Sequence, residues 1–60
     1  MNVYVNDQEV NLAQGMTVKH ALIAAGLIDV IKQGKKVYDE TGNEIGLDGA
    51  LTEGAKIQVR

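Results

Sequence analysis

The chain of 60 residues contains no cysteine, no proline, no phenylalanine and no tryptophan. Without cysteine it has neither a disulfide framework nor thiolate ligands for zinc or an iron–sulfur cluster. Disulfides and bound metals commonly stabilise very small domains. Tyr4 and Tyr38 are its only aromatic residues. A core must therefore be built from Val, Ile, Leu and Ala, and at this length residues 1–60 are expected to form one domain.

Neither sign of charge dominates, since six Lys and Arg face eight Asp and Glu and the formal net charge is −2. The longest basic run is Lys35-Lys36, whereas a nucleic-acid binder of this size normally presents a basic face, so we expect no nucleic-acid partner. No apolar run approaches the ~20 residues of a membrane span. No signal-peptide segment follows Met1, and the chain is therefore expected to be cytoplasmic.

Residues suited to catalysis or metal binding are few and scattered. His20 is the single histidine, and on the predicted helix it faces solvent beside Lys19, without a nucleophile or an orienting partner. The oxygen-rich stretch that starts at Asp39 fails the calcium-loop spacing, because its sixth position is Glu44 and its twelfth is Ala50. We therefore predict a chain that is not an enzyme and has no catalytic residue, no metal and no cofactor.

The glycines of the second half fit neither the dinucleotide nor the Walker phosphate-binding pattern. These residues are Gly42, Gly46, Gly49 and Gly54. We predict that these glycines lie in turns and adopt positive φ angles.

Both ends of the chain alternate apolar and polar residues with period two, which predicts strands. Val3–Asn6 and Glu9–Leu12 flank the turn-forming segment Asn6–Gln8, so they are predicted to form a hairpin. Its inward side chains are expected to be Val3, Val5, Val10 and Leu12. The segment 55–60 is the predicted last strand, with Ile57 and Val59 facing inward.

The most regular helical pattern lies between two capping signals. Thr17 is a predicted N-cap, and Gly26 occupies the position where helices end in a left-handed residue. The residues at i, i+3, i+4 and i+7 are apolar and form one stripe: Val18, Ala21, Leu22 and Ala25. We therefore predict a helix over Thr17–Ala25.

The middle of the chain, residues 27–51, gives weaker signals. Leu27–Ile31 fits either a short turn of helix or an extended link. The pattern after Gly34 predicts a strand over 36–39, a turn over 40–43 and a short strand over 44–45. Leu47 and Leu51 are expected to anchor a tight turn to the core.

The predicted order is hairpin, helix, short hairpin, turn and terminal strand. A helix that crosses one sheet face after a hairpin brings the last strand back beside the first, in parallel. Ile57 and Val59 would then lie next to Val3 and Val5. The predicted fold class is α+β, a ubiquitin-like β-grasp with a mixed four- to five-stranded sheet packed on one helix.

Several motifs resemble the first half of known β-grasp families: Val3-x-Val5-Asn6, Val10, Gly15-Met16-Thr17-Val18 and Ala21-Leu22-x-x-Ala25-Gly26. They are similar to those of sulfur-carrier proteins of thiamine and molybdopterin synthesis, of soluble-ligand-binding β-grasp domains and of ferredoxin-like N-terminal 2Fe–2S domains. The ending 51–59 resembles the closing turn and strand of carriers. The chain has no cluster-binding cysteine and no Gly-Gly tail, so the resemblance implies the fold and not these activities.

A non-catalytic protein-interaction module is the function expected from this fold without reactive residues, standing alone or within a larger complex, including a redox complex. Tyr4, Tyr38 and Gln58 are expected on the open sheet face, where tyrosine suits partner binding. The alternative surface is the apolar segment that contains Ile28 and Ile31. A second hypothesis is a sulfur-carrier-like protein whose Gly-Gly tail is absent from this chain.

Overall fold

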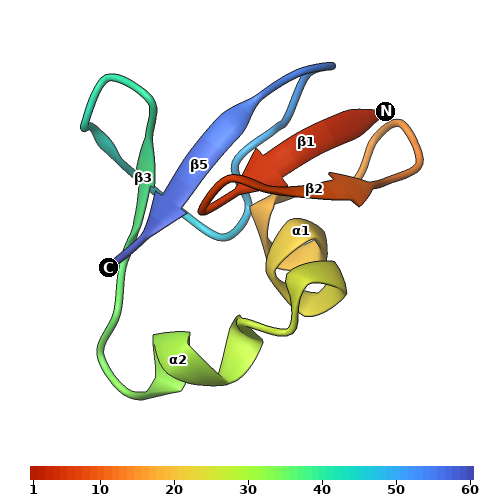
Figure 1. The fold of residues 1–60 in the computed structure, drawn as a ribbon. Coiled ribbons are helices and arrows are strands. Elements are labelled where there is room, and N and C mark those ends of the chain that lie inside the picture. Colours follow the sequence, from red (N-terminus) through yellow and green to blue (C-terminus); the bar gives the residue numbers. More distant parts are fainter.

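A computed structural model describes residues 1–60 as a five-stranded mixed sheet with α1 packed against one face (Figure 1). The elements in chain order are β1 (Asn2–Val5), β2 (Gln8–Asn11), α1 (Val18–Ala25), α2 (Ile28–Lys32), β3 (Val37–Asp39), β4 (Glu44–Ile45) and β5 (Lys56–Val59). The strand order is β2-β1-β5-β3-β4, and β5 runs parallel to β1 and antiparallel to β3. This is the ubiquitin-like β-grasp arrangement, so the predicted fold class is confirmed.

The first hairpin closes through a two-residue turn in which Asn6 and Asp7 both have positive φ, 49° and 69°. Positive φ at both central residues matches the twist of the flanking strands and sets the register Val5↔Gln8. The side chain of Asn6 also ties the hairpin to the last strand. Its Oδ1 accepts the Val59 N–H at 2.8 Å, and its Nδ2 donates to the Val59 carbonyl at 3.4 Å.

The predicted caps of α1 are confirmed. Thr17 has extended backbone angles at the N-cap, and Gly26 is left-handed with φ 75°. The first amides of the helix find acceptors in the loop before β5, because Val18 N–H donates to the Gly49 carbonyl and Lys19 N–H to that of Leu47. The predicted stripe faces the sheet, and only its last residue, Ala25, is less than fully buried.

The core lies between α1 and the sheet and is entirely aliphatic. Its nine buried residues are Val3, Val5, Val10, Leu12, Val18, Ala21, Leu22, Val37 and Ile57. All four inward residues predicted for the first hairpin belong to it. Leu47 and Leu51 are half-buried and pack against it, as expected of anchors for the loop between β4 and β5.

The segment after α1 is helical. Of the two predictions for Leu27–Ile31 the helical one is correct, since α2 covers Ile28–Lys32. Asp29 in its first turn and Lys32 in its last turn both complement the helix dipole. No helix of the structure combines the length and the apolar character needed to cross a bilayer.

Three predictions about the last third of the chain are corrected, for Val59, Gly46 and Gly49. Ile57 and Val59 were expected beside Val3 and Val5, but Ile57 pairs with Val5, and Val59 lies beyond the end of β1 and pairs with Val37 of β3. The two parallel strands are offset, so β5 extends past the end of β1. The end of β5 pairs with β3 instead. The predicted parallel arrangement is right, and the placement of Val59 is wrong.

Gly46 and Gly49 also differ from their prediction, since neither has a positive φ, whereas Gly42 and Gly54 have φ of 91° and 80° as predicted. A Cβ at Gly49 would lie 3.1 Å from the Gly46 carbonyl oxygen and 3.4 Å from Cγ2 of Val18. Glycine therefore suits this position because an added Cβ would crowd the Gly46 carbonyl oxygen, and not because of its backbone conformation.

Candidate interaction surfaces

Three of the predicted partner-binding residues lie on the sheet face opposite α1. Tyr4 alternates with the buried Val3 and Val5, so its side chain points to this open face, where it is half-buried. Its neighbours across the strands are Glu9 on β2 and Lys56 on β5. Charged side chains thus flank the ring on both sides.

Tyr38 lies two strands away from Tyr4, at a strand separation of about 4.8 Å per step. Gln58 and Glu44 are its direct cross-strand neighbours. The Arg60 guanidinium carbon lies 4.7 Å from the ring centroid, a cation–π contact that covers part of the ring. The open face therefore presents two separate tyrosines among polar groups and no continuous apolar patch.

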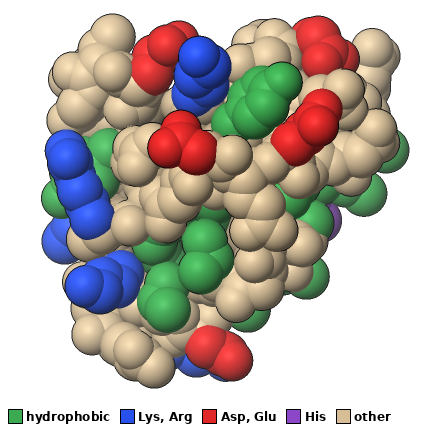
Figure 2. Space-filling model, viewed as in Figure 1, with side chains coloured by type: hydrophobic (Ala, Val, Ile, Leu, Met, Phe, Trp, Pro, Cys, Tyr) green, Lys and Arg blue, Asp and Glu red, His purple; other side chains and the backbone are tan.

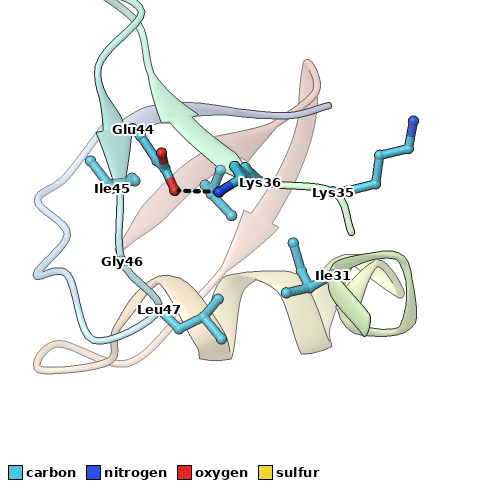
Figure 3. Close-up of a pocket in the computed structure, with 8 residues that line it drawn as sticks. Ile31, Lys35, Lys36, Glu44, Ile45, Gly46 and Leu47 are labelled. Atoms are coloured by element: carbon cyan, nitrogen blue, oxygen red, sulfur yellow. Dashed lines mark hydrogen bonds and ion pairs between the residues drawn. The ribbon is translucent and has the colours of Figure 1, made fainter. Parts of the chain in front are cut away.

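A concave site lined by both apolar and charged residues occurs instead between α2, β3 and β4, and we call it the α2–β4 hollow (Figure 3). It has a volume of about 170 Å³ and is lined by Ile31, Lys35, Lys36, Val37, Glu44, Ile45, Gly46 and Leu47. Ile31, Ile45 and Leu47 are half-buried, so each leaves part of its surface open to a ligand. Figure 2 shows hydrophobic side chains gathered between the sheet and α2.

The rim of the α2–β4 hollow is charged. Lys36 Nζ lies 3.5 Å from Glu44 Oε2, and both side chains remain more than half exposed, at 59% and 55%. This is the single ion pair of the structure. Lys35 extends away from the hollow in Figure 3 and has no carboxylate partner.

The five residues predicted to bind a partner do not form one surface. Ile31 lines the α2–β4 hollow, whereas Ile28 is half-buried against the core and lies outside that lining. Tyr4, Tyr38 and Gln58 occupy the open sheet face. β3 contributes to both surfaces, because Val37 points to the hollow and Tyr38 to the open face.

A second hollow, between β2 and α1, was not anticipated from the sequence. It has a volume of about 280 Å³ and is lined by Asn11, Leu12, Ala13, Met16, His20, Ile23 and Ala24. Ile23 is the one large hydrophobic side chain that is exposed, at 52%. The sequence carried a signal, because Ile23 is a bulky apolar residue outside the buried stripe of α1.

His20 is exposed, as predicted, and it has a structural role that the sequence reasoning missed. Its Nδ1 accepts the backbone N–H of Thr17 at 3.1 Å, and the Thr17 hydroxyl lies 3.1 Å from the same nitrogen. The spacing is that of a capping box, with His in place of the usual Glu or Gln. The Thr-x-x-His pattern was therefore the available signal.

The carboxylate of Asp39 is used inside the β3–β4 turn. Its Oδ1 accepts the Thr41 hydroxyl at 2.7 Å and the N–H groups of Thr41 and Asn43, each at 2.9 Å. The hydrogen bond from the Thr41 hydroxyl, followed by that from the Asn43 amide, lowers the pKa of Asp39. The predicted turn over 40–43 is confirmed. No three His, Cys, Asp or Glu side chains lie close enough together to hold a metal ion.

Comparison of the chain with family models, curated proteins and solved structures finds no match. The β-grasp assignment therefore rests on strand order, the β1–β2 hairpin and the parallel β1–β5 pair. The likeness to sulfur carriers and 2Fe–2S domains stays a prediction. So does the alternative of a carrier without its Gly-Gly tail, which the intact mass of the natural gene product would test.

Proposed function

We propose that this domain is a non-catalytic ubiquitin-like protein-interaction module, acting alone or as part of a larger assembly. The observation that supports it is the α2–β4 hollow, a concave site with an apolar floor and a charged rim. Interaction sites commonly combine a pocket for one buried anchor with a polar surround that fixes orientation. The hollow has both parts.

The energetics of such an anchor favour the hollow over the open sheet face. Burying one Leu, Ile or Val side chain of a partner contributes about 1.5–3 kcal/mol to the binding free energy. The same side chain would cover the exposed parts of Ile31, Ile45 and Leu47, which are half-buried in the free protein. At the open face, Tyr38 is already in contact with Arg60, so a partner gains less from covering its ring. We therefore place the main contact at the hollow.

Gly46 offers a way to fill the hollow without deleting a core contact. It lines the hollow, its φ is not positive, and an added Cβ meets no atom within 4 Å. We expect Gly46→Leu to occupy part of the volume and to weaken binding of the natural partner by about tenfold or more, the cost of losing one anchor of ~1.5 kcal/mol. Calorimetric titration with the partner, identified by cross-linking in source cells, measures this loss.

The matched control is a double variant at the open sheet face, Tyr4→Ala with Tyr38→Ala. If binding through the hollow is the function, this variant keeps its affinity while Gly46→Leu loses it. Thermal melts of both proteins establish that each is folded. Loss of binding in the tyrosine variant, with Gly46→Leu unchanged, would move the site to the open face and contradict the proposal.

A further inference from the structure

The start of α1 is closed by an acceptor nitrogen of His20. Nδ1 of the ring accepts the backbone N–H of Thr17 at 3.1 Å, and the Thr17 hydroxyl lies 3.1 Å from the same nitrogen. An imidazole nitrogen accepts a hydrogen bond only while it carries no proton, so this contact requires the neutral ring with its hydrogen on Nε2. The cap of α1 therefore depends on a group that loses its acceptor when it takes up one proton.

Protons reach this ring without any rearrangement of the fold, because His20 is exposed. Histidine is the side chain whose charge ordinarily changes between about pH 5 and pH 8. Protonation places a hydrogen on Nδ1, which then meets the Thr17 N–H donor to donor. The Thr17 hydroxyl oxygen can accept the new hydrogen, but the Thr17 N–H is left without its acceptor.

The charged groups around His20 do not compensate for a positive ring. The first turn of α1 has no acidic residue, and Lys19 is the neighbour of His20 in that turn. The segment 11–16, which lies beside the ring, has no charged residue, and Glu9 of β2 lies beside Tyr4 on the opposite face of the sheet. Asp48, in the loop before β5, makes no ion pair with the ring. A cation in the first turn also opposes the helix dipole, so the charged ring is disfavoured here.

The capped residue is also a junction between α1 and a distant loop. Thr17 forms a β-bridge with Ala50, and the N–H groups of Val18 and Lys19 donate to carbonyls of the same loop at 3.1 and 3.0 Å. His20 in addition lines the hollow between β2 and α1. Protonation of one exposed ring therefore acts on the helix start, on its junction with the loop before β5 and on the charge of this hollow.

We propose that His20 makes the start of α1 a pH-sensitive switch. The neutral imidazole closes the cap, and the protonated imidazole releases the Thr17 N–H and loosens the junction with the loop before β5. Acidification then destabilises the folded state, because the unfolded chain takes up the same proton without losing a hydrogen bond. The switch is separate from the α2–β4 hollow and goes beyond the proposed interaction function.

NMR of the labelled protein tests the state of the ring. Nitrogen-15 spectra at about pH 8 should show Nδ1 without a proton and Nε2 with one. During titration to about pH 5 the Thr17 amide should shift with the same midpoint as the His20 ring. Amides of β3, three places from β2 in the sheet, serve as the internal reference. A neutral ring with its proton on Nδ1, or a Thr17 amide that does not follow the ring, would overturn the proposal.

The matched control for stability is His20→Gln, since glutamine is a usual residue at this position of a capping box and does not titrate. Urea denaturation of both proteins at about pH 8 and about pH 5 stays above the ordinary titration of Asp and Glu. We expect acidification to lower the ratio of folded to unfolded molecules about twofold to fivefold more in the parent than in the variant, which corresponds to the loss of one helix cap. The difference between the two proteins cancels the contribution of every other titrating group.

His20→Ala separates the loss of the cap from the added charge. This variant has neither acceptor nor charge, so it should be less stable than the parent at about pH 8 and at least as stable as the parent at about pH 5. A parent that stays more stable than His20→Ala at the lower pH contradicts the switch. So does a parent whose stability depends on pH in the same way as that of His20→Gln.

Discussion

At the scale of single residues, Asp39 shows how one carboxylate organises a turn. Three donors converge on the same oxygen, led by the Thr41 hydroxyl. They favour the charged form, so the folded-state pKa lies below the ordinary value of 3.8. A depressed carboxyl pKa contributes stability above the ordinary pKa, and this contribution is lost as the pH falls through the folded-state pKa.

We therefore expect the Asp39 carboxyl to titrate below pH 3.8 in the folded protein. Thr41→Val removes the leading hydrogen bond and should raise that pKa toward the ordinary range. Carbon-13 NMR of the carboxyl group over an acid titration measures both values. Glu40→Gln in the same turn serves as a control, since Glu40 makes no hydrogen bond to this oxygen. A pKa of Asp39 at or above its ordinary value would refute the assignment.

Individual residues were predictable from the sequence where the cause is local. The alternation of the first hairpin identified its buried side chains, and the left-handed conformation of Gly26 follows from its place after a helix. Gly49 and Val59 were not predictable in this way. Their surroundings depend on contacts with Val18 and Val37, which lie far away in sequence and are fixed only by the packed fold.

At the scale of elements, α1 is held by caps at both ends. The N-terminal cap includes the acceptor Nδ1 of His20, which satisfies the Thr17 N–H. The backbone of the loop before β5 supplies two further acceptors for Val18 and Lys19. The helix start is thus tied both to its own sequence and to a distant loop.

His20→Ala is expected to reduce the free energy of unfolding by about 0.5–1 kcal/mol, because the Thr17 amide loses its acceptor. His20→Gln should restore much of this loss, since Gln is a usual residue at this position of a capping box. Urea denaturation followed by circular dichroism measures the difference. Lys19→Ala, one position earlier on the exposed surface, should change the stability by less than His20→Ala. Equal stabilities of the Ala variant and the parent would exclude a capping role.

The periodicity of the sequence did not predict the α2–β4 hollow. Leu27–Ile31 was ambiguous because five residues fit a helical turn and an extended link equally well. The hollow combines residues from α2, β3, β4 and the loop after it, so it exists only after tertiary packing. Ile31 was the one lining residue predicted to bind a partner.

At the scale of the whole molecule, the small aliphatic core limits stability. Domains of this size rarely gain more than about 3–5 kcal/mol from a single core. Leu22 is the largest of the fully buried side chains and contacts the sheet from the middle of α1. Ile23 follows it in sequence and is 52% exposed.

Alanine variants of the buried Leu22 and the exposed Ile23 therefore form a matched pair. Leu22→Ala is expected to cost about 2–5 kcal/mol, comparable to the total stability, so the protein should be largely unfolded at 37 °C. Ile23→Ala removes the same kind of side chain from a half-open position and should leave the protein folded, with a loss below about 1.5 kcal/mol. Thermal denaturation followed by circular dichroism distinguishes them. A cooperative melt of Leu22→Ala near that of the parent would show that the core is organised differently.

The central place of β5 has a consequence for synthesis in the cell. The β1–β2 hairpin and the β3–β4 hairpin make no direct strand pairing with each other, and β5 joins them. β5 is also the last of the strands to leave the ribosome, since chains emerge from the N-terminus onward. The sheet therefore has no continuous hydrogen-bonded form until residues 56–59 are free of the exit tunnel. The complete sheet therefore forms only after its final strand has emerged, since a two-stranded hairpin alone is marginally stable at best.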